Sequence, residues 1–332
     1  MPRTPTSRRR SSSSCCRRPV RTRSPTPASG SADPVAVQLL PDRRDRSGRR
    51  DRRLPRDPRR RRDGGALRDR RLPVAVLVPA LVGLALLVLP AVALLVRAPW
   101  STLGQRLASE TVLDALRVSV TSALLATAIS LLLGVPLAWL LTASDAWPAV
   151  WRRLLRAVVT VPLVLPPVVG GIALLYLLGR NGLLGRPLDA ALGITIPFTL
   201  AAVVIAQTFV AMPFLVLSVE GALRGVDRGL DDAAASLGAS RWYAFRRVTV
   251  PLVVPGVTAG AVLCFARALG EFGATITFAG TFPGRTQTLP TSVYLAQQSD
   301  PETAVAISLL LLAVGVGVLL LLRDRWLTTG AR

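Results

Sequence analysis

Few side chains in this sequence could carry out covalent chemistry. All 41 basic residues are arginine, because the chain contains neither lysine nor histidine. These absences exclude a Walker A loop, a Ser-His-Asp triad, a histidine-containing zinc site and a Schiff-base lysine. The three cysteines, Cys15, Cys16 and Cys264, have no spacing typical of a disulfide framework or a metal site. The sequence therefore predicts a non-covalent function, with no catalytic residue, metal or cofactor on this chain.

The loop at residues 218–251 has the composition of a binding surface. Alanines follow a pair of aspartates, and Gly238 stands where a tight turn or a left-handed helix cap could form. A second amphipathic stretch, 241–250, runs to Pro251, which we expect to open the next apolar segment. Two short helices joined at a glycine would form a protruding elbow that another protein can approach closely. The alternative interpretation is an ordinary connecting loop.

A charged pair lies inside an apolar stretch further along the chain. Arg267 and Glu271 are four residues apart, so a continuous helix would place them on one face. Ionisable groups at membrane depth are costly and usually face a bundle interior or a water-filled cavity. In one interpretation Arg267 supplies positive potential for an anion, and in the other the two charges neutralise each other and fix the packing. A deep anion site would slow release, which favours the packing role.

Glycines and threonines surround this pair. Glycines on both sides of the glutamate permit a bend or a close contact. The hydroxyls of Thr275 and Thr277 either contact an oxyanion or donate back to their own helix, and back-bonding is the commoner behaviour. Upstream, Gly170 and Gly171 indicate a close helix–helix contact. Our candidates for a translocation path or gate are seven residues: Arg267, Gly270, Glu271, Phe272, Gly273, Thr275 and Thr277.

The chain has 332 residues, 51% of them hydrophobic, yet it carries a formal net charge of +22. Residues 1–72 hold 23 basic and 7 acidic residues, a net +16, which leaves +6 for the rest. Such an arginine-rich tail cannot bury enough apolar area to fold, so we expect it to be disordered and cytoplasmic. It is a solvated tail, a site for anionic lipid or nucleic acid, or a start-site artefact. The third interpretation arises because the only methionines are Met1 and Met212.

Six stretches of the remaining chain are apolar over about the 20 residues that a helix needs to cross a bilayer. They are residues 74–96, 118–141, 157–178, 194–217, 252–269 and 304–322. Six such runs leave too little polar surface for a soluble protein. The sequence therefore predicts an all-α, polytopic membrane protein with six transmembrane helices.

The arginines between these stretches indicate the orientation. The segments that would lie inside contain eleven arginines: 143–156, 218–251 and 323–332. The segments that would lie outside contain six: 97–117, 179–193 and 270–303. The positive-inside rule places both termini in the cytoplasm, and the segments after the tail give this result by themselves.

The loop 218–251 resembles the coupling-loop signature of ABC importer permeases. That signature is an acidic residue, two alanines, three residues, a glycine, nine residues and then aliphatic-x-aliphatic-Pro. The matching positions are Asp232, Ala233, Ala234, Gly238, Val248, Val250 and Pro251. Aspartate replaces the usual glutamate and valine the usual isoleucine and leucine, which preserves charge or shape. In that family the elbow inserts into a separate ATPase subunit, so the resemblance implies that ATP and Mg are bound by a partner.

A second block, residues 265–294, is similar to the permease subunit of molybdate importers, as is 161–171. Sulfate and thiosulfate permeases share the ALGE core at 268–271 but usually diverge after it. The segments that favour molybdate are FGATITF at 272–278, PG at 283–284 and TQTLP at 286–290. The resemblance covers about residues 112–325 and implies a type I importer core. Residues 73–111 would then add a first transmembrane helix and an outer loop.

The resemblance implies a transport subunit, not an enzyme, in the bacterial plasma membrane. It would import molybdate, and with it tungstate, by alternating access. The implied partners are an ATPase dimer, an extracytoplasmic molybdate-binding protein and a second permease copy. The nearest alternative is a sulfate or thiosulfate permease of the same superfamily. A further alternative, an intramembrane enzyme, is disfavoured because the chain has no histidine, no lysine and no set of metal ligands. No nucleic-acid partner is expected, because binding to DNA would have to come from the tail alone.

Overall fold

The computed structural model describes residues 74–227 and 229–329, which belong to one compact unit of the chain. These residues form helices joined by turns and loops, with no strand among them, which confirms the all-α prediction. The predicted tail, 1–72, lies outside the described residues. The helices are α1 (Val74–Val96), α2 (Leu103–Leu107), α3 (Glu110–Ala143), α4 (Ala149–Val164), α5 (Pro167–Leu178), α6 (Gly185–Leu192), α7 (Leu200–Arg224), α8 (Gly229–Ser236), α9 (Arg241–Ala244), α10 (Val250–Leu269), α11 (Gly273–Phe278), α12 (Leu289–Ser299) and α13 (Pro301–Thr329).

Two short elements of other helical types complete this part of the chain. The 3-10 turn η2 (Ser144–Ala146) follows α3, and the π-helical turn η3 (Phe245–Thr249) joins α9 to α10. Five of the helical segments are long and apolar enough to cross a membrane, and there are six if the bent pair α4 and α5 forms one span. The predicted first span coincides with α1.

The third predicted span, 157–178, is not a continuous helix. Its residues are divided between α4 and α5, which meet at an angle of 114°. Pro166 and Pro167 cause this break, because a proline disfavours helical geometry in the residue before it. Leu165 and Pro166 accordingly have extended ψ angles of 130° and 132°.

The fourth span begins at Leu200 and not at residue 194. Ile196 precedes Pro197, which disfavours helix at that point, and Phe198 has a φ of +62°. Thr199 then caps α7, because its side chain accepts a hydrogen bond from Ala202 N–H at 3.3 Å. The helix continues to Arg224, so the first part of the loop 218–251 is also helical.

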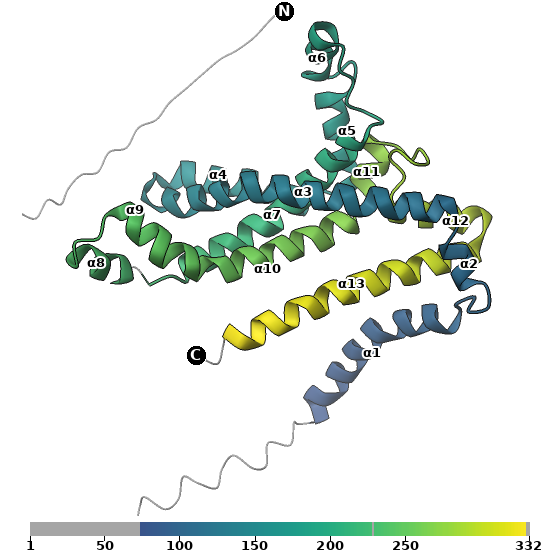
Figure 1. The fold of residues 1–332 in the computed structure, drawn as a ribbon, viewed down its shortest axis with the longest axis horizontal. Helices are drawn as coiled ribbons and strands as arrows, with labels where there is room; N and C mark the ends of the chain where they lie inside the picture. Colours follow the sequence, from purple (N-terminus) through teal and green to yellow (C-terminus); the bar gives the residue numbers. More distant parts are fainter. Residues whose placement is uncertain (1–73, 228, 330–332) are drawn as a thin grey trace, which may run out of the picture. The chain divides into compact units, whose positions relative to one another are not determined.

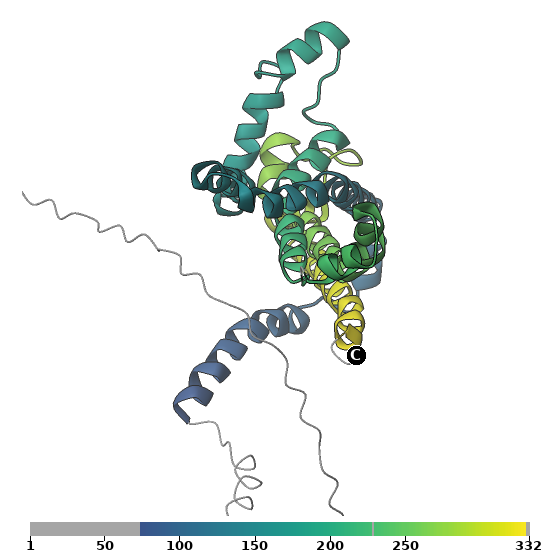
Figure 2. The same cartoon turned by 90° about the vertical axis from the view of Figure 1, so that its left-hand side faces the viewer.

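The core of the protein lies between α3, α7 and α10, which pack side by side (Figures 1 and 2). Glycines permit the close approach of their backbones. A Cβ atom on Gly134 would lie 2.7 Å from Leu215 Cδ2, and one on Gly256 would lie 2.2 Å from Ala222 Cβ. Small residues at such contacts are typical of helices that associate in lipid, where packing replaces the hydrophobic effect as the driving force.

Smaller contacts attach the remaining helices to this core. α5 packs against α11, α12 packs against α13, and α1 makes its main contact with α13. Ser119 Oγ in α3 accepts a hydrogen bond of 2.7 Å from Leu289 N–H at the start of α12. Arg106 in α2 forms ion pairs with Asp300 and Glu302 at the start of α13. These contacts fix the segment between α11 and α13, which follows the broken end of α10.

Candidate functional site

The elbow in the loop 218–251 is formed by α8, a glycine turn and α9 (Figure 1). Gly238 has a φ of +80°, a conformation that residues with a side chain rarely adopt. Gly238 N–H donates to Ala235 O, and Ala239 N–H donates to Ala234 O, each at 3.0 Å. These two bonds form the Schellman pattern, which ends a helix at a left-handed residue. The predicted left-handed cap at Gly238 is therefore confirmed.

The second half of the elbow runs into the next membrane helix without a break. Ser240 Oγ accepts a hydrogen bond from Tyr243 N–H at 3.3 Å and caps α9. The π-helical turn η3 then makes the helix continuous from Arg241 to Leu269. Pro251 lies in the first turn of α10, as expected, but the amphipathic stretch before it does not end there. A wider π-helical turn accommodates a proline ring that would clash with a carbonyl in a regular α-helix.

The residues of the coupling-loop signature lie on both halves of the elbow. In chain order they are Asp232, Ala233 and Ala234 in α8, Gly238 in the turn, Val248 in η3, and Val250 and Pro251 at the start of α10. Ala233 is exposed and Ala234 is half-buried. Methyl side chains on α8 leave its backbone accessible to a partner surface.

Sequence reasoning missed three large exposed side chains on this elbow. Leu237, Trp242 and Tyr243 are 88%, 68% and 57% exposed. Three large side chains exposed together at a tight turn form an apolar patch that is available to a partner. The neighbouring tryptophan and tyrosine in a polar loop are the signal that could have identified them, because aromatic residues are enriched in protein interfaces.

Aromatic contacts connect the elbow to the helix core. The rings of Phe245 and Trp139 lie edge to face, with centroids 5.1 Å apart, and Phe245 also lies 5.4 Å from Trp242. Phe245 belongs to η3 and Trp139 to α3. The elbow is therefore joined to α10 by helix continuity and to α3 by ring packing.

The other end of α10 is broken at the charged pair. The helix stops at Leu269, and α11 begins after Gly270, Glu271 and Phe272. The pair nevertheless forms, because Arg267 Nη1 lies 2.6 Å from Glu271 Oε2. Glu271 Oε1 accepts a hydrogen bond of 2.8 Å from Ala274 N–H in the first turn of α11. Both carboxylate oxygens are thus used to hold the two helices together.

The two blocks that carry the molybdate resemblance lie in contact. A Cβ atom on Gly171 would lie 1.8 Å from Thr277 Oγ1 and 2.7 Å from Ala274 O. A Cβ atom on Gly273 would lie 3.0 Å from Pro167 Cβ. The predicted close contact at the glycine pair is therefore confirmed: Gly171 faces α11, and a Cβ atom on Gly170 would lie 2.9 Å from Phe209 Cε1 in α7.

The candidate path residues behave differently from one another. Thr277 Oγ1 donates back to Gly273 O at 2.8 Å, as expected for a helix threonine. Thr275 is fully buried, and its Oγ1 has no hydrogen-bond partner among the described residues. The Phe272 ring lies 5.3 Å from that of Tyr294 in α12. A Cβ atom on Gly270 would meet no atom closer than 3.6 Å, so close packing does not require a glycine there. Gly270 instead lies at the C-terminal cap of α10, where the helix ends.

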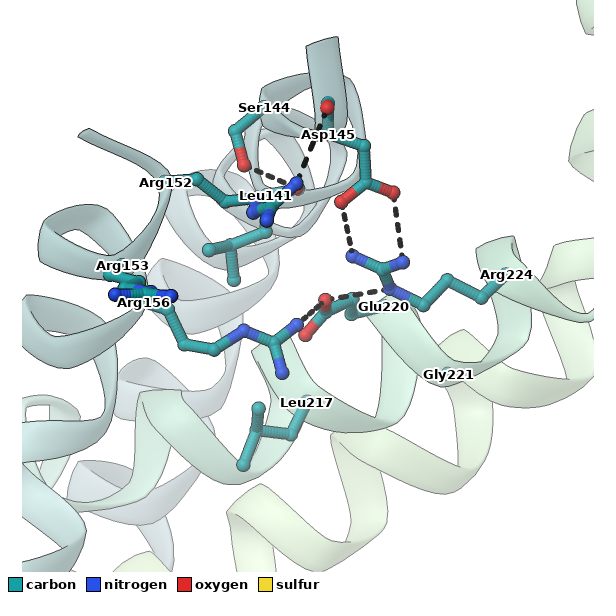
Figure 3. A pocket seen from close by; sticks show the side chains of 10 residues that line it. All are labelled: Leu141, Ser144, Asp145, Arg152, Arg153, Arg156, Leu217, Glu220, Gly221 and Arg224. Carbon is teal, nitrogen blue, oxygen red and sulfur yellow. Dashed lines mark hydrogen bonds and ion pairs between the residues drawn. The ribbon is translucent and has the colours of Figure 1, made fainter. Parts of the chain in front are cut away.

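A polar pocket of about 540 Å³ lies where α3, η2, α4 and α7 meet (Figure 3). We call it the arginine pocket, and its lining residues are Leu141, Ser144, Asp145, Arg152, Arg153, Arg156, Leu217, Glu220, Gly221 and Arg224. In the sequence, these arginines indicate only the orientation of the chain in the membrane. Their gathering depends on the hairpin between α3 and α4, which spacing alone does not indicate.

The described residues offer little to a metal ion. Nowhere in 74–227 or 229–329 do three or more histidine, cysteine, aspartate or glutamate side chains come together in a way that could hold one. Cys264 is a buried free thiol. The other two cysteines lie outside the described residues.

Known proteins match the chain over most of this structure. Residues 134–329 match the family described as binding-protein-dependent transport system inner membrane component. The molybdenum transport system permease protein ModB of Mycobacterium tuberculosis is 49% identical over 236 residues, 71% of this chain and 88% of the relative. The protein of that name from Escherichia coli is 40% identical over 219 residues, 66% of this chain and 94% of the relative.

Solved structures have a similar fold. A bacterial ABC transporter for import of the acidic polysaccharide alginate matches with a TM-score of 0.57 at 18% identity, over 76% of this chain and 93% of its own. The MetNI methionine ABC transporter matches with a TM-score of 0.52 at 18% identity, over 66% of this chain and 96% of its own. The helix arrangement is therefore that of ABC importer permeases, and the chain, matched over more than half its length, belongs to the binding-protein-dependent transport system inner membrane components.

Proposed function

We propose that this chain is the membrane-spanning subunit of an ATP-driven importer for molybdate. The observation that carries the proposal is the 49% identity, over 236 residues, to a protein named as a molybdenum transport system permease. The contact between Gly171 and α11 supports it, because it joins the two blocks in which the resemblance to molybdate permeases is found. Tungstate, an oxyanion of similar size and charge, is the expected second cargo.

The elbow is the site at which a separate ATPase subunit docks. Its turn is fixed by Gly238, and its exposed Leu237 and Trp242 need a partner surface. ATP and Mg are bound by that ATPase, and closure of an ATPase pair pulls two elbows together. The motion reaches α10 and α3 through η3 and the contact between Phe245 and Trp139. The bundle then opens outward, and hydrolysis resets it.

The broken end of α10 lies beside the path of the oxyanion. Arg267 and Glu271 hold the break, because both carboxylate oxygens are occupied. Phe272, Gly270 and Gly273 shape the turn between the helices. Thr275 is the hydroxyl best able to meet an oxyanion when the bundle opens, because Thr277 already donates to its own helix.

The remaining assignments follow from this role. A binding protein outside the membrane delivers the oxyanion, and two copies of this chain form the pathway, since ATPases of this kind work as a pair. Both termini lie in the cytoplasm. The chain is divided into a tail at 1–72, a first helix with its outer loop at 73–111 and a permease core at 112–325, with the coupling loop at 218–251.

The test is uptake of labelled molybdate by cells that lack the chain, with and without the full chain restored. We expect restoration of molybdate uptake, competition by tungstate and little competition by sulfate. Restored sulfate or thiosulfate uptake without molybdate uptake would assign the chain to the alternative cargo. Restoration of neither, with the chain in the membrane together with its ATPase, would overturn the proposal.

A further inference from the structure

The arginine pocket carries more positive charge than its own acids neutralise. Four arginines and two carboxylates line it, an excess of +2 when all are ionised. Arg224 binds both oxygens of Asp145, at 2.9 and 3.1 Å, and its Nε lies 2.9 Å from Glu220 Oε1. Arg156 reaches the same Glu220 oxygen from α4 (Figure 3). Arg153 is exposed and has neither a hydrogen bond nor an ion pair within the described part of the chain.

The pocket also has more hydrogen-bond donors than acceptors. A guanidinium group has five N–H donors and no acceptor. Arg152 donates a hydrogen bond from Nη1 to the backbone carbonyl of Asp145, at 3.5 Å, and Arg156 donates one from Nη2 to Glu220 Oε1. The remaining donors of these two arginines, together with those of Arg153, belong to side chains that line the pocket. Planar guanidinium groups match the oxygens of a tetrahedral oxyanion in pairs, which gives both charge and geometry.

The pocket lies at the end of two long apolar helices, where a bilayer around them would place its lipid headgroups. α3 and α7, whose apolar stretches could cross the bilayer, both end at it. Trp147 and Trp151, which are 42% and 60% exposed, lie beside it in the chain, and such tryptophans mark the membrane–water interface. On α4, Trp151, Leu154 and Val158 form an exposed apolar face opposite the arginines, as in helices that lie in this interface.

We propose that the arginine pocket binds a tetrahedral oxyanion, and that the phosphate group of an acidic phospholipid is the source its position favours. A lipid phosphodiester, with its single negative charge, would neutralise half of the pocket's excess charge of +2 and connect α4 to the end of α7, just before the coupling elbow. A free oxyanion from the cytoplasm has the same chemistry, so the two sources must be separated by experiment. The proposal does not depend on the cargo or on the ATPase.

The experiment compares the purified full chain with Arg153→Gln in mild detergent. Arg153 has no hydrogen-bond or ion-pair partner to lose among the described residues, so this variant should fold normally. Native mass spectrometry measures how much dioleoyl phosphatidylglycerol and how much dioleoyl phosphatidylcholine each protein retains. We expect the wild type to prefer the acidic lipid and Arg153→Gln to bind it about fivefold more weakly, as for the loss of one arginine at a membrane surface. Arg153→Lys should fall between them.

Arg247→Gln is the matched control, because Arg247 is also exposed and lies outside the pocket. Unchanged lipid retention by this control assigns the effect to the pocket. Inorganic phosphate and molybdate are tested separately, on lipid-free protein, by thermal unfolding. Stabilisation by either ion that Arg153→Gln abolishes would identify a soluble oxyanion as the ligand. An equal loss in both variants, or no response to lipid, phosphate or molybdate, would overturn the proposal.

Discussion

The guanidinium group of Arg267 lies 2.6 Å from the carboxylate of Glu271 across the end of a helix. The helix stops between them, yet the pair closes, because Glu271 turns back while its other oxygen accepts from Ala274 N–H. The side chain of Glu271 is 1% exposed and that of Arg267 is 27% exposed. The pair thus joins α10 to α11, with one carboxylate oxygen facing Arg267 and the other accepting from the first turn of α11.

Replacement of Glu271 by glutamine should destabilise the protein by about 3 kcal/mol, because it leaves the Arg267 charge without its partner. A double variant, Arg267→Met with Glu271→Gln, should regain most of the stability and also the uptake. Thermal unfolding in detergent and labelled-molybdate uptake in cells measure the two properties. A double variant that is as stable as the wild type but does not transport would contradict a purely packing role and assign Arg267 to the path.

Gly171→Ala should cost about 1–3 kcal/mol by overpacking. Its new methyl group would lie 1.8 Å from Thr277 Oγ1 and 2.7 Å from the Ala274 carbonyl, and the backbone of α11 cannot move aside easily. Gly83→Ala in α1 is the control, since a Cβ there meets nothing within 4 Å. Equal unfolding temperatures for the two variants would show that α5 and α11 are not in close contact.

Gly238→Arg should abolish uptake without preventing membrane insertion. A Cβ on Gly238 meets no atom within 4 Å, so the effect must come from the φ of +80° and from the blocked surface of the elbow. Gly238→Asn is the comparison, because asparagine tolerates the left-handed conformation and should retain most of the uptake. Normal ATP-coupled uptake by the arginine variant would refute the coupling role.

The exposed side chains of the elbow should matter for association and not for folding. Leu237→Ser removes apolar surface that is 88% exposed, so the unfolding temperature of the isolated chain should hardly change. Trp242→Ser removes a side chain that is 68% exposed but also its ring contact with Phe245, so a small decrease in unfolding temperature is expected. Co-purification of the ATPase subunit should fall sharply. Leu183→Ser, at a site 79% exposed between α5 and α6, should leave co-purification intact. If all three variants retain the ATPase equally, docking does not use this surface.

Acid should loosen the contact between α2 and α13. The pKa of Asp300 is held below its ordinary value by the hydroxyl and the N–H of Thr303, and then by Arg106. A carboxylate with a lowered pKa contributes stability above its unfolded-state pKa, and this contribution is lost as pH falls through the folded-state pKa.

Thr303→Val should therefore bring the pKa of Asp300 back toward its ordinary value and lessen the extra loss of stability at low pH. Unfolding temperatures between neutral pH and about pH 3 measure this difference. Thr258→Val is the control, because that hydroxyl donates to Pro255 O within its own helix. The same acid response in wild type and Thr303→Val would mean that this carboxylate does not couple to folding.

Local signals in the sequence predicted the elements that depend on local chemistry. The span at 74–96 is uniformly apolar and coincides with α1, and Gly238 has the left-handed cap that its place after the alanines indicates. The break at Pro166 was missed, because an apolar run reads the same whether it crosses the membrane straight or bends inside it. The start of α7 was missed because Pro197 and Phe198 are apolar but not helical.

The arginine pocket could not be predicted, because its members come from three segments that meet only after folding. Asp145 follows α3, Arg152 and Arg156 belong to α4, and Glu220 belongs to α7. Spacing along the chain says nothing about such an encounter. The contact between Gly171 and Thr277 could not be predicted for the same reason. A glycine in an apolar helix indicates that another helix approaches closely, but it does not indicate which helix.

The bend between α4 and α5 also bears on how the protein is made. With 16 and 12 residues, the two helices are about 24 and 18 Å long, and neither reaches across a hydrocarbon layer of about 30 Å. Their packing partners are α7 and α11, which are synthesised later. The bent pair can therefore complete its packing only after the chain has been synthesised as far as Phe278, the end of α11.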